Sequence, residues 1–216
     1  MLKTYSYLLM VLCLVTGVCR AGPVYDNTSV DTFNSVMFST GYAQLGDQVH
    51  LAAPSQLASL ETQFFNLGGD TTFDATLRFY MTGTLTQIGA SFTVTGLSIG
   101  AFESLNVAFL DLGGLYVPAD VIVMLSIGNL SGDGDLGLNL FDAPTVGSSS
   151  NQSYFADAGA GLVEESTLSG IDNVYFRISA VPTATQDVPE PSTIWLVLAV
   201  MPGLVGLRQR QVARRA

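Results

Sequence analysis

The sequence has few charged residues, and basic residues are almost absent from its central segment. Only 12% of its 216 residues are Asp, Glu, Lys or Arg, against about 25% in an average soluble protein. The segment 22–187 holds two arginines and 17 acidic residues, a net charge of −15. Phosphate binding needs clustered Lys and Arg, so nucleic acid is not expected as a partner. The apolar share of 48% argues against disorder over most of the length.

The central segment also lacks the residues that carry much of site chemistry. Both cysteines, Cys13 and Cys19, precede residue 22, His50 is the single histidine, and no lysine follows Lys3. From residue 22 on, this excludes disulfides and thiolate metal sites, and a zinc site would need several His or Cys. A phosphate-binding loop built around a lysine is excluded as well. We therefore expect no cofactor, apart from the calcium ion considered below.

Residues 1–21 have the organisation of a secretory signal peptide. Lys3 gives a positive start, residues 7–18 are almost entirely apolar, and Cys19 and Ala21 are small residues at −3 and −1 of a cut after Ala21. The stretch is too short to span a membrane. The sequence therefore predicts export, with an N-terminal core helix or a lipoprotein linked through Cys19 as alternatives.

The other end of the chain has three consecutive parts. Residues 182–191 are a linker that ends in Pro189, Glu190 and Pro191, and proline there forces extended backbone. Residues 192–207 are uncharged; as a transmembrane helix they would reach about 24 Å, short against a hydrocarbon core of about 30 Å. Residues 208–216 are basic, and the positive-inside rule predicts a cytoplasmic tail. Its four arginines are Arg208, Arg210, Arg214 and Arg215.

This three-part order resembles the PEP-CTERM sorting signal. The resemblance implies an exported protein of a Gram-negative bacterium, recognised by an integral-membrane transpeptidase, an exosortase, through Pro189, Glu190 and Pro191. It implies that 192–207 hold the protein transiently in the inner membrane before delivery to the cell surface or extracellular matrix. Proteins of this family accompany exopolysaccharide production, so biofilm or floc matrix is the implied setting. An ordinary C-terminal membrane anchor behind a Pro-rich stalk is the alternative.

Residues 22–181 are expected to form one all-β domain, an antiparallel β-sandwich or jelly roll. Apolar and polar residues alternate with period two, and Gly, Asn, Asp and Ser interrupt the runs. A short helix over 55–60 is an alternative to strand at that place. About nine strands are predicted, over residues 35–42, 48–52, 60–65, 75–81, 91–97, 105–109, 121–127, 153–156 and 174–178.

Four segments of this domain carry a second resemblance. They are VYDN at 24–27, LGDQV at 45–49, FDATLRFY at 73–80 and NVYFRI at 173–178. Together they resemble the choice-of-anchor domains, which are exported β-rich modules found with different C-terminal sorting tails. The resemblance implies a surface adhesive or structural module and supplies no active site.

One segment is a candidate site for a hard cation. Asp133, Asp135 and Asn139 place oxygen side chains along a Gly-rich stretch, and Ca²⁺ favours clusters of carboxylate and carbonyl oxygens. The segment lacks the third ligand and the closing Glu of an EF-hand loop. The alternative is an acidic hairpin turn in which Asp and Gly serve backbone geometry.

The sequence therefore favours a non-enzymatic, exported surface or matrix protein. A carbohydrate-binding module is a second hypothesis, with Tyr80, Tyr116 and Tyr175 as candidate exposed aromatics. A hydrolase that uses two carboxylates is a third, and it requires a carboxyl with a raised pKa in a cleft beside another carboxylate. Arg78 and Arg177 are expected to pair with carboxylates on the sheet surface.

Overall fold

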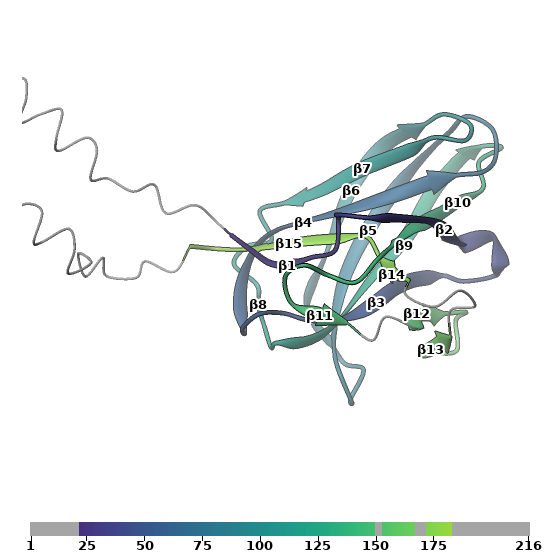
Figure 1. Cartoon of the computed structure of the whole chain (residues 1–216). Helices are drawn as coiled ribbons and strands as arrows, with labels where there is room; N and C mark the ends of the chain where they lie inside the picture. The colour runs from purple at the N-terminus through teal and green to yellow at the C-terminus, as the bar shows by residue number, and fades with distance from the viewer. Residues whose placement is uncertain (1–21, 150–152, 167–171, 183–216) are drawn as a thin grey trace, which may run out of the picture. The chain divides into compact units, whose positions relative to one another are not determined.

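The computed structural model describes residues 22–149, 153–166 and 172–182, and these build two antiparallel β-sheets without any α-helix (Figure 1). The predicted all-β class is confirmed, and the pair of sheets is consistent with a β-sandwich. The described residues belong to one compact unit, Arg20–Pro182. The predicted signal peptide, sorting motif, membrane helix and basic tail lie outside the described residues. Within the described ranges, no helix has the length and apolarity needed to cross a membrane.

The first sheet has eight strands. Its main path runs β1-β15-β4-β10-β14, with β2 beside β10 and with β7 and β8 beside β4. The strands are β1 (Pro23–Asp26), β2 (Asp31–Met37), β4 (Ser55–Asn66), β7 (Ser104–Leu110), β8 (Tyr116–Val117), β10 (Leu136–Phe141), β14 (Asn173–Val174) and β15 (Phe176–Ala180). A single 3-10 turn, η1 (Phe38–Thr40), follows β2.

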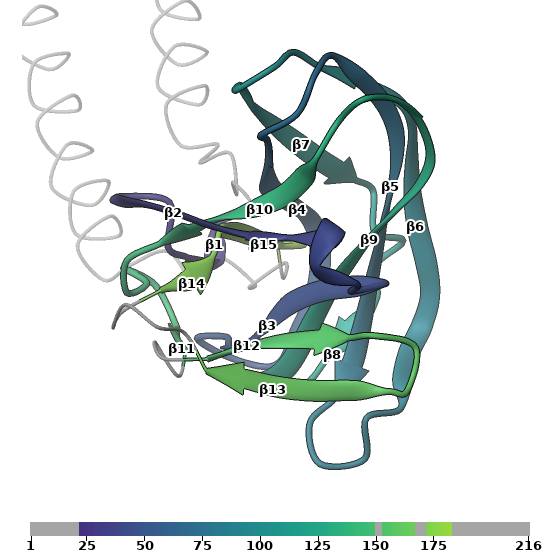
Figure 2. The ribbon, with the colours of Figure 1, turned by 90° about the vertical axis from the view of Figure 1, so that its right-hand side faces the viewer.

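The second sheet has seven strands. Its order is β13-β12-β3-β9-β5-β6, with β11 beside β3. The strands are β3 (Gln44–His50), β5 (Thr71–Met81), β6 (Gln87–Ile99), β9 (Asp120–Gly132), β11 (Ser148–Ser149), β12 (Ser153–Asp157) and β13 (Leu162–Ser166). Figure 2 shows β6 beside β5. In the strand order, β6 and the β12–β13 hairpin are at opposite ends of the sheet.

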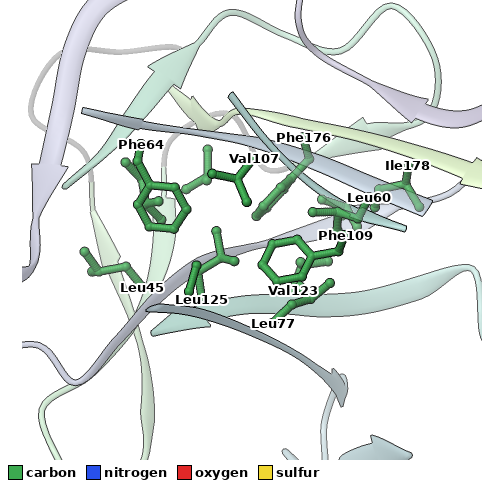
Figure 3. Packing of buried hydrophobic residues seen from close by; sticks show 14 of the residues in the cluster. Leu45, Leu60, Phe64, Leu77, Val107, Phe109, Val123, Leu125, Phe176 and Ile178 are labelled. Atoms are coloured by element: carbon green, nitrogen blue, oxygen red, sulfur yellow. The ribbon is translucent and has the colours of Figure 1, made fainter. Parts of the chain in front are cut away.

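The core lies between the two sheets and follows from the period-two pattern. Along β5, alternate residues from Thr71 to Phe79 are buried, while their neighbours face outward. Phe64 of β4 meets Phe73 of β5, with ring centroids 5.1 Å apart. Figure 3 shows Phe64, Val107, Phe109 and Phe176 from one sheet facing Leu45, Leu77, Val123 and Leu125 from the other.

The strand β9 departs from this alternation. Its residues Val121–Leu125 are all buried, because each face of the strand has its own cover. Val121, Val123 and Leu125 point into the main core. On the opposite face, Ile122 and Met124 pack against Phe155 of β12, with Tyr80 and Leu162 at the edge of this second cluster.

The predicted helical alternative over 55–60 is wrong, since these residues begin strand β4. Leu57 and Leu60 are both fully buried, a three-residue spacing that also suits one face of a helix. Here the spacing comes from an irregular register opposite Ala180, where the pairing with β15 skips a residue. Pairing with β15, β7 and β8 therefore decides the local structure, and the helical spacing does not.

Both ends of the described domain lie side by side. Pro23 of β1 is opposite Ser179 of β15, and the backbone N–H of Ala180 donates to the carbonyl oxygen of Gly22 at 3.3 Å. β4 starts at this end, because Ala180 is opposite Leu57. Nine residues farther along β4, Asn66 lies about 30 Å away at about 3.3 Å per residue.

Candidate functional site

The end of the domain marked by Asn66 gathers three turns. The side-chain Oδ1 of Asn66 accepts from the backbone N–H of Gly68 and of Asp135, both at 3.0 Å. Its Nδ2 donates to the carbonyl oxygens of Gly69 and Gly100, at 2.8 and 3.0 Å. One fully buried amide thus joins the β4–β5, β6–β7 and β9–β10 turns. The sequence analysis did not single out Asn66, although the Gly68-Gly69 pair that follows Leu67 is a turn signal.

The three residues predicted to bind calcium do not meet. Asp133 and Asp135 lie in the β9–β10 turn, and their backbone oxygens already accept from the N–H groups of Gly69 and Leu67. Asn139 is four positions along β10, about 13 Å from Asp135. Its Nδ2 donates to Gln63 Oε1 at 2.7 Å and to Ser104 Oγ at 2.9 Å. Among the described residues, no three His, Cys, Asp or Glu side chains are grouped to hold a metal, so the calcium site stays a prediction resting on Asp133 and Asp135.

The three candidate tyrosines are divided between the two sheets. Tyr80 is half-buried on the outer face of β5, and its hydroxyl donates to Gln44 Oε1 at 3.1 Å. Tyr116 on β8 of the other sheet is 64% exposed. Tyr175 is only 6% exposed; its ring meets Phe141 edge-on at 4.7 Å. The three tyrosine rings therefore do not lie on one sheet face.

The chain is not in a strand at Tyr175, which lies between β14 and β15. The side chain of Asn27 lies against the chain on both sides of Tyr175. It donates to the carbonyl oxygen of Val174 at 2.9 Å and accepts from the N–H of Phe176 at 2.8 Å. These two bonds separate β14 from β15. The hydroxyl of Tyr175 then donates to Glu61 Oε1 at 3.1 Å, and burial together with this charge raises the pKa of Tyr175 to about 12.

The outer face of β5 carries a row of polar side chains that reach both neighbouring strands. Arg78 Nη1 donates to Ser126 Oγ of β9 at 2.8 Å, and the hydroxyls of Thr76 and Thr93 lie 3.0 Å apart. In the described part of the chain Arg78 makes no ion pair, so its predicted carboxylate partner is replaced by a hydroxyl. This row joins β5 to β6 and β9 and leaves polar groups half-exposed on the sheet.

Arg177 does pair with carboxylates, as predicted. Its Nε lies 3.1 Å from Asp26 Oδ2, and its Nη1 lies 4.0 Å from Glu61 Oε2. Burial acts to raise the pKa of Asp26, but hydrogen bonds from Thr28 and the charge of Arg177 outweigh burial and hold that pKa below its usual value. The pair links β1 to β15, where the two ends of the domain meet.

One carboxyl with a raised pKa is enclosed in the protein. Asp47 on β3 is 1% exposed, and its Oδ2 accepts from the backbone N–H of Val174 at 3.3 Å, which ties the two sheets together. Burial raises the pKa of Asp47 well above its usual value, and the charge of Glu164 adds to this. Burial and the charge of Asp47 also raise the pKa of Tyr25. Because solvent does not reach the Asp47 carboxyl, its raised pKa reflects a structural group and not a general acid in a cleft.

The His50–Asp120 pair lies far from the serine of the Gly-x-Ser-x-Gly spacing. His50 Nδ1 lies 2.7 Å from Asp120 Oδ1, with both side chains more than half exposed. The spacing Gly-x-Ser-x-Gly of a nucleophile elbow occurs over residues 96–100, but its Ser98 lies inside β6 and not at a strand-to-helix turn. Thr72 of β5 is paired on one side with Ser98 of β6 and on the other with Ser131, near the C-terminal end of β9. Asp120 opens the same strand, so the two positions are separated by about 35 Å.

Comparisons with known proteins do not add to this geometry. No protein-family model matches the chain. Searches of curated proteins and of solved structures give no match either. The resemblances to the PEP-CTERM signal and to choice-of-anchor domains therefore remain predictions carried by their own residues.

Proposed function

We propose that the chain is an exported, non-enzymatic module of the bacterial cell surface or extracellular matrix, sorted by an exosortase in the setting of exopolysaccharide. In this proposal the β-sandwich is flanked by a signal peptide and a short membrane helix. Pro189, Glu190 and Pro191 form the recognition element, and the terminal arginines set the orientation. The observation that carries the proposal is the position of the two ends of the domain.

The chain enters and leaves the domain at one place. The hydrogen bond between Ala180 and Gly22, with the adjacent Arg177–Asp26 pair, holds the first and last strands together. A leader and a sorting tail joined here leave the opposite end of the sandwich, at the Asn66 turns, about 30 Å from the attachment point. This geometry supports a module that is held at one end and displayed at the other.

The charge of the domain supports the same setting. With the segment after Pro191 and the leader removed, two arginines remain against 18 acidic residues, a net charge of −16. Such a domain stays soluble outside the cell and is repelled by anionic polysaccharide at low salt. Divalent cations would bridge the domain to such a polymer, which makes them the first partners to test.

The test compares the full-length chain with a variant of the sorting motif in a host that expresses an exosortase. For the wild type we expect a surface form whose intact mass lacks the residues after about position 190 and those before about position 22. Changing Pro189, Glu190 and Pro191 together to Ala, Gln and Ala should leave the tail attached and the protein in the membrane fraction. The matched control changes Thr183 and Thr185 to Ala and should be processed normally. Retention of the tail by the wild-type surface form, or normal processing of the motif variant, would contradict the proposal.

Carbohydrate binding is a second candidate, favoured by the polar row on β5. Arg78, Thr76 and Tyr80 present donors and one aromatic ring on a half-exposed sheet face, the combination that sugar recognition uses. Affinity electrophoresis in gels containing a panel of polysaccharides should show retardation that Arg78→Ala removes and Thr72→Ala, on the same strand, leaves unchanged. Equal mobility in all gels, or equal loss in both variants, would count against this function.

A further inference from the structure

Four polar side chains from four strands meet in the interior of the domain. They are Tyr25 of β1, Asp47 of β3, Ser149 of β11 and Asn173 of β14. Tyr25 and Asn173 are fully buried, Asp47 is 1% exposed and Ser149 is half-buried. Two of these strands belong to each sheet. Neither the sorting motif nor the polar row on β5 uses this group, and a buried polar cluster needs a physical explanation.

Within this cluster, a serine hydroxyl lies against the side-chain amide of an asparagine. The Oγ of Ser149 donates to Oδ1 of Asn173. Ser149 is opposite Val49 of β3, whose side chain lies in the core, so the hydroxyl of Ser149 also points inward. The hydrogen bond holds the serine oxygen close to the carbonyl carbon of the amide, and a nucleophile reacts from about 3–3.5 Å. A nucleophile and an electrophile are therefore in contact inside the domain.

A buried carboxyl stands beside both groups. Asp47 is two residues before Val49 on the same face of β3, which makes it a diagonal neighbour of Ser149. Its Oδ2 accepts from the backbone N–H of Val174 at 3.3 Å, and Val174 follows Asn173 directly. Its Oδ1 is buried and has no hydrogen-bond partner among the described residues. Asp47 therefore has one oxygen free to exchange a proton with its neighbours.

The surroundings keep Asp47 in the form that donates a proton. Burial raises the pKa of Asp47 well above its usual value, and the charge of Glu164 adds to this. Burial and the charge of Asp47 raise the pKa of Tyr25, whereas Ser149 acts to lower it, so these three side chains face one another. Solvent does not reach Asp47, which excludes an external substrate. A reaction between two buried side chains needs no access from solvent.

We propose that Ser149 and Asn173 form an intramolecular ester that joins the two sheets covalently. The oxygen of Ser149 bonds to the side-chain carbon of Asn173, the bond from that carbon to Nδ2 breaks, and the nitrogen leaves as ammonia. The hydroxyl proton reaches the leaving nitrogen through Asp47, which gives up one proton, takes another and ends unchanged. No oxidant, reductant or other reactant is consumed. The reaction runs once in each molecule, so it involves no catalytic turnover.

Two physical conditions favour the ester once it forms. Ammonia escapes into solvent as ammonium, which draws the reaction forward, and burial keeps water away from the new bond. A disulfide is not available for this purpose, because the chain has no cysteine after Cys19. The ester would tie β11 to β14, immediately before β15, from which the chain leaves the domain. It would therefore anchor the last strand to the rest of the fold.

The first test is a mass measurement on the full-length chain, purified in mild detergent. No Lys or Arg lies between Arg78 and Arg177, so trypsin releases Ser149 and Asn173 in one peptide, 79–177. The ester lowers the mass of this peptide by one ammonia, about 17 Da. Further cleavage at its glutamates should leave the fragments that carry the two residues joined until hydroxylamine, which cleaves esters, separates them. A peptide of full sequence mass, or a gain of about 1 Da with separate fragments, as in deamidation, would overturn the proposal.

The second test applies the same measurement to matched variants of the full-length chain, with circular dichroism to confirm that each one folds. Ser149→Ala should keep the full sequence mass, and Ser149→Thr, which retains a hydroxyl, should lose ammonia. The control Ser148→Ala removes the exposed neighbour on the same strand and should lose ammonia as the wild type does. Asp47→Asn keeps the size of the side chain but removes the acid, and should lower the linked fraction at least about tenfold.

The outcomes of these variants are distinct. Loss of ammonia in Ser149→Ala, or its absence in Ser148→Ala, would overturn the ester. Equal linkage in Asp47→Asn and wild type would overturn the part assigned to Asp47. If Ser149→Ala does not fold, the mass of the wild-type peptide still decides whether the bond exists.

The inference rests on the buried cluster and not on the sorting motif. A chain of full sequence mass at Ser149 and Asn173 that is still processed after Pro191 would remove the inference and leave the proposed function intact. A linked domain whose tail is not processed would have the opposite meaning.

Discussion

The two margins of the seven-stranded sheet differ in almost every property that governs strand pairing. β13 is short, carries Glu164 and Glu165, and belongs to a hairpin whose Phe155 and Leu162 pack over the outer face of the sheet. β6 is long, lacks charge and has an outer face of Ser and Thr. The difference shows that the acidic character of this domain is unevenly placed. Negative charge lies on the short edge strand β13, whereas the long edge strand β6 carries none and is irregular in its pairing with β5.

The largest expected effect concerns the hairpin that ends at β13. Phe155→Ala should lower the free energy of unfolding by about 3 kcal/mol, because the ring fills the small core over Ile122 and Met124. Phe92→Ala on β6 should cost less, since Phe92 is only partly buried. Urea unfolding measures both losses, and amide exchange should rise first in β12 and β13 for Phe155→Ala. If both variants lose the same free energy of unfolding, the side chains at the two edges of the sheet contribute equally to stability.

Next in size is a pH effect at Asp47, whose pKa is raised by burial and by the nearby charge of Glu164. The folded state favours the protonated carboxyl. Its contribution is therefore fully present below the unfolded pKa of about 3.8 and is lost as pH rises through the folded pKa. Asp47→Asn should remove this loss, so its melting temperature relative to wild type should increase from pH 4 to pH 8. Parallel melting curves over that range would show that the buried carboxyl is not protonated.

A smaller effect is expected from removing the charges that guard β13. Glu164→Gln with Glu165→Gln should change the melting temperature little but increase the aggregated fraction after prolonged incubation near neutral pH, because an exposed edge without charge can pair. Light scattering over time measures this. Glu103→Gln, which removes one charge in the β6–β7 turn, serves as the control. If both variants aggregate at the same rate, net charge and not edge protection is responsible.

The smallest effect belongs to Asp74, which accepts a hydrogen bond from the N–H of Gly96 in the bulge between Val94 and Leu97 of β6. Hydrogen bonds from the N–H of Gly96 and from Asn129 hold the pKa of Asp74 below its usual value. Its stabilising contribution is therefore present above the usual pKa and is lost as pH falls through the lowered one. Asp74→Asn should be slightly less stable than wild type at pH 6, and the difference should shrink as pH falls through the lowered pKa of Asp74. A difference that stays constant with pH would contradict the cap.

The sequence by itself determined the fold class, because an apolar face repeated every second residue can be buried only by strands. β5 shows this directly, since its alternation in sequence is its alternation in burial. Likewise, the absence of cysteine after Cys19 and the distribution of charge could be interpreted without coordinates. The carboxylate partner of Arg177 was foreseen as a type of contact, although not as Asp26.

Tertiary structure decided what depends on residues distant in sequence. Leu57 and Leu60 are both buried although three residues separate them, because the pairing of β15 with β4 has an irregular register at Leu57. Asn27 bonds the backbone on both sides of Tyr175 from 148 positions away in the chain. The amide of Asn139 is bonded to Gln63 and Ser104. Ile122 and Met124 are buried only because a hairpin thirty residues later covers them. The local pattern of residues determines which face of a strand is apolar. Packing across the whole domain determines which strands are neighbours and which strands lie at the edges.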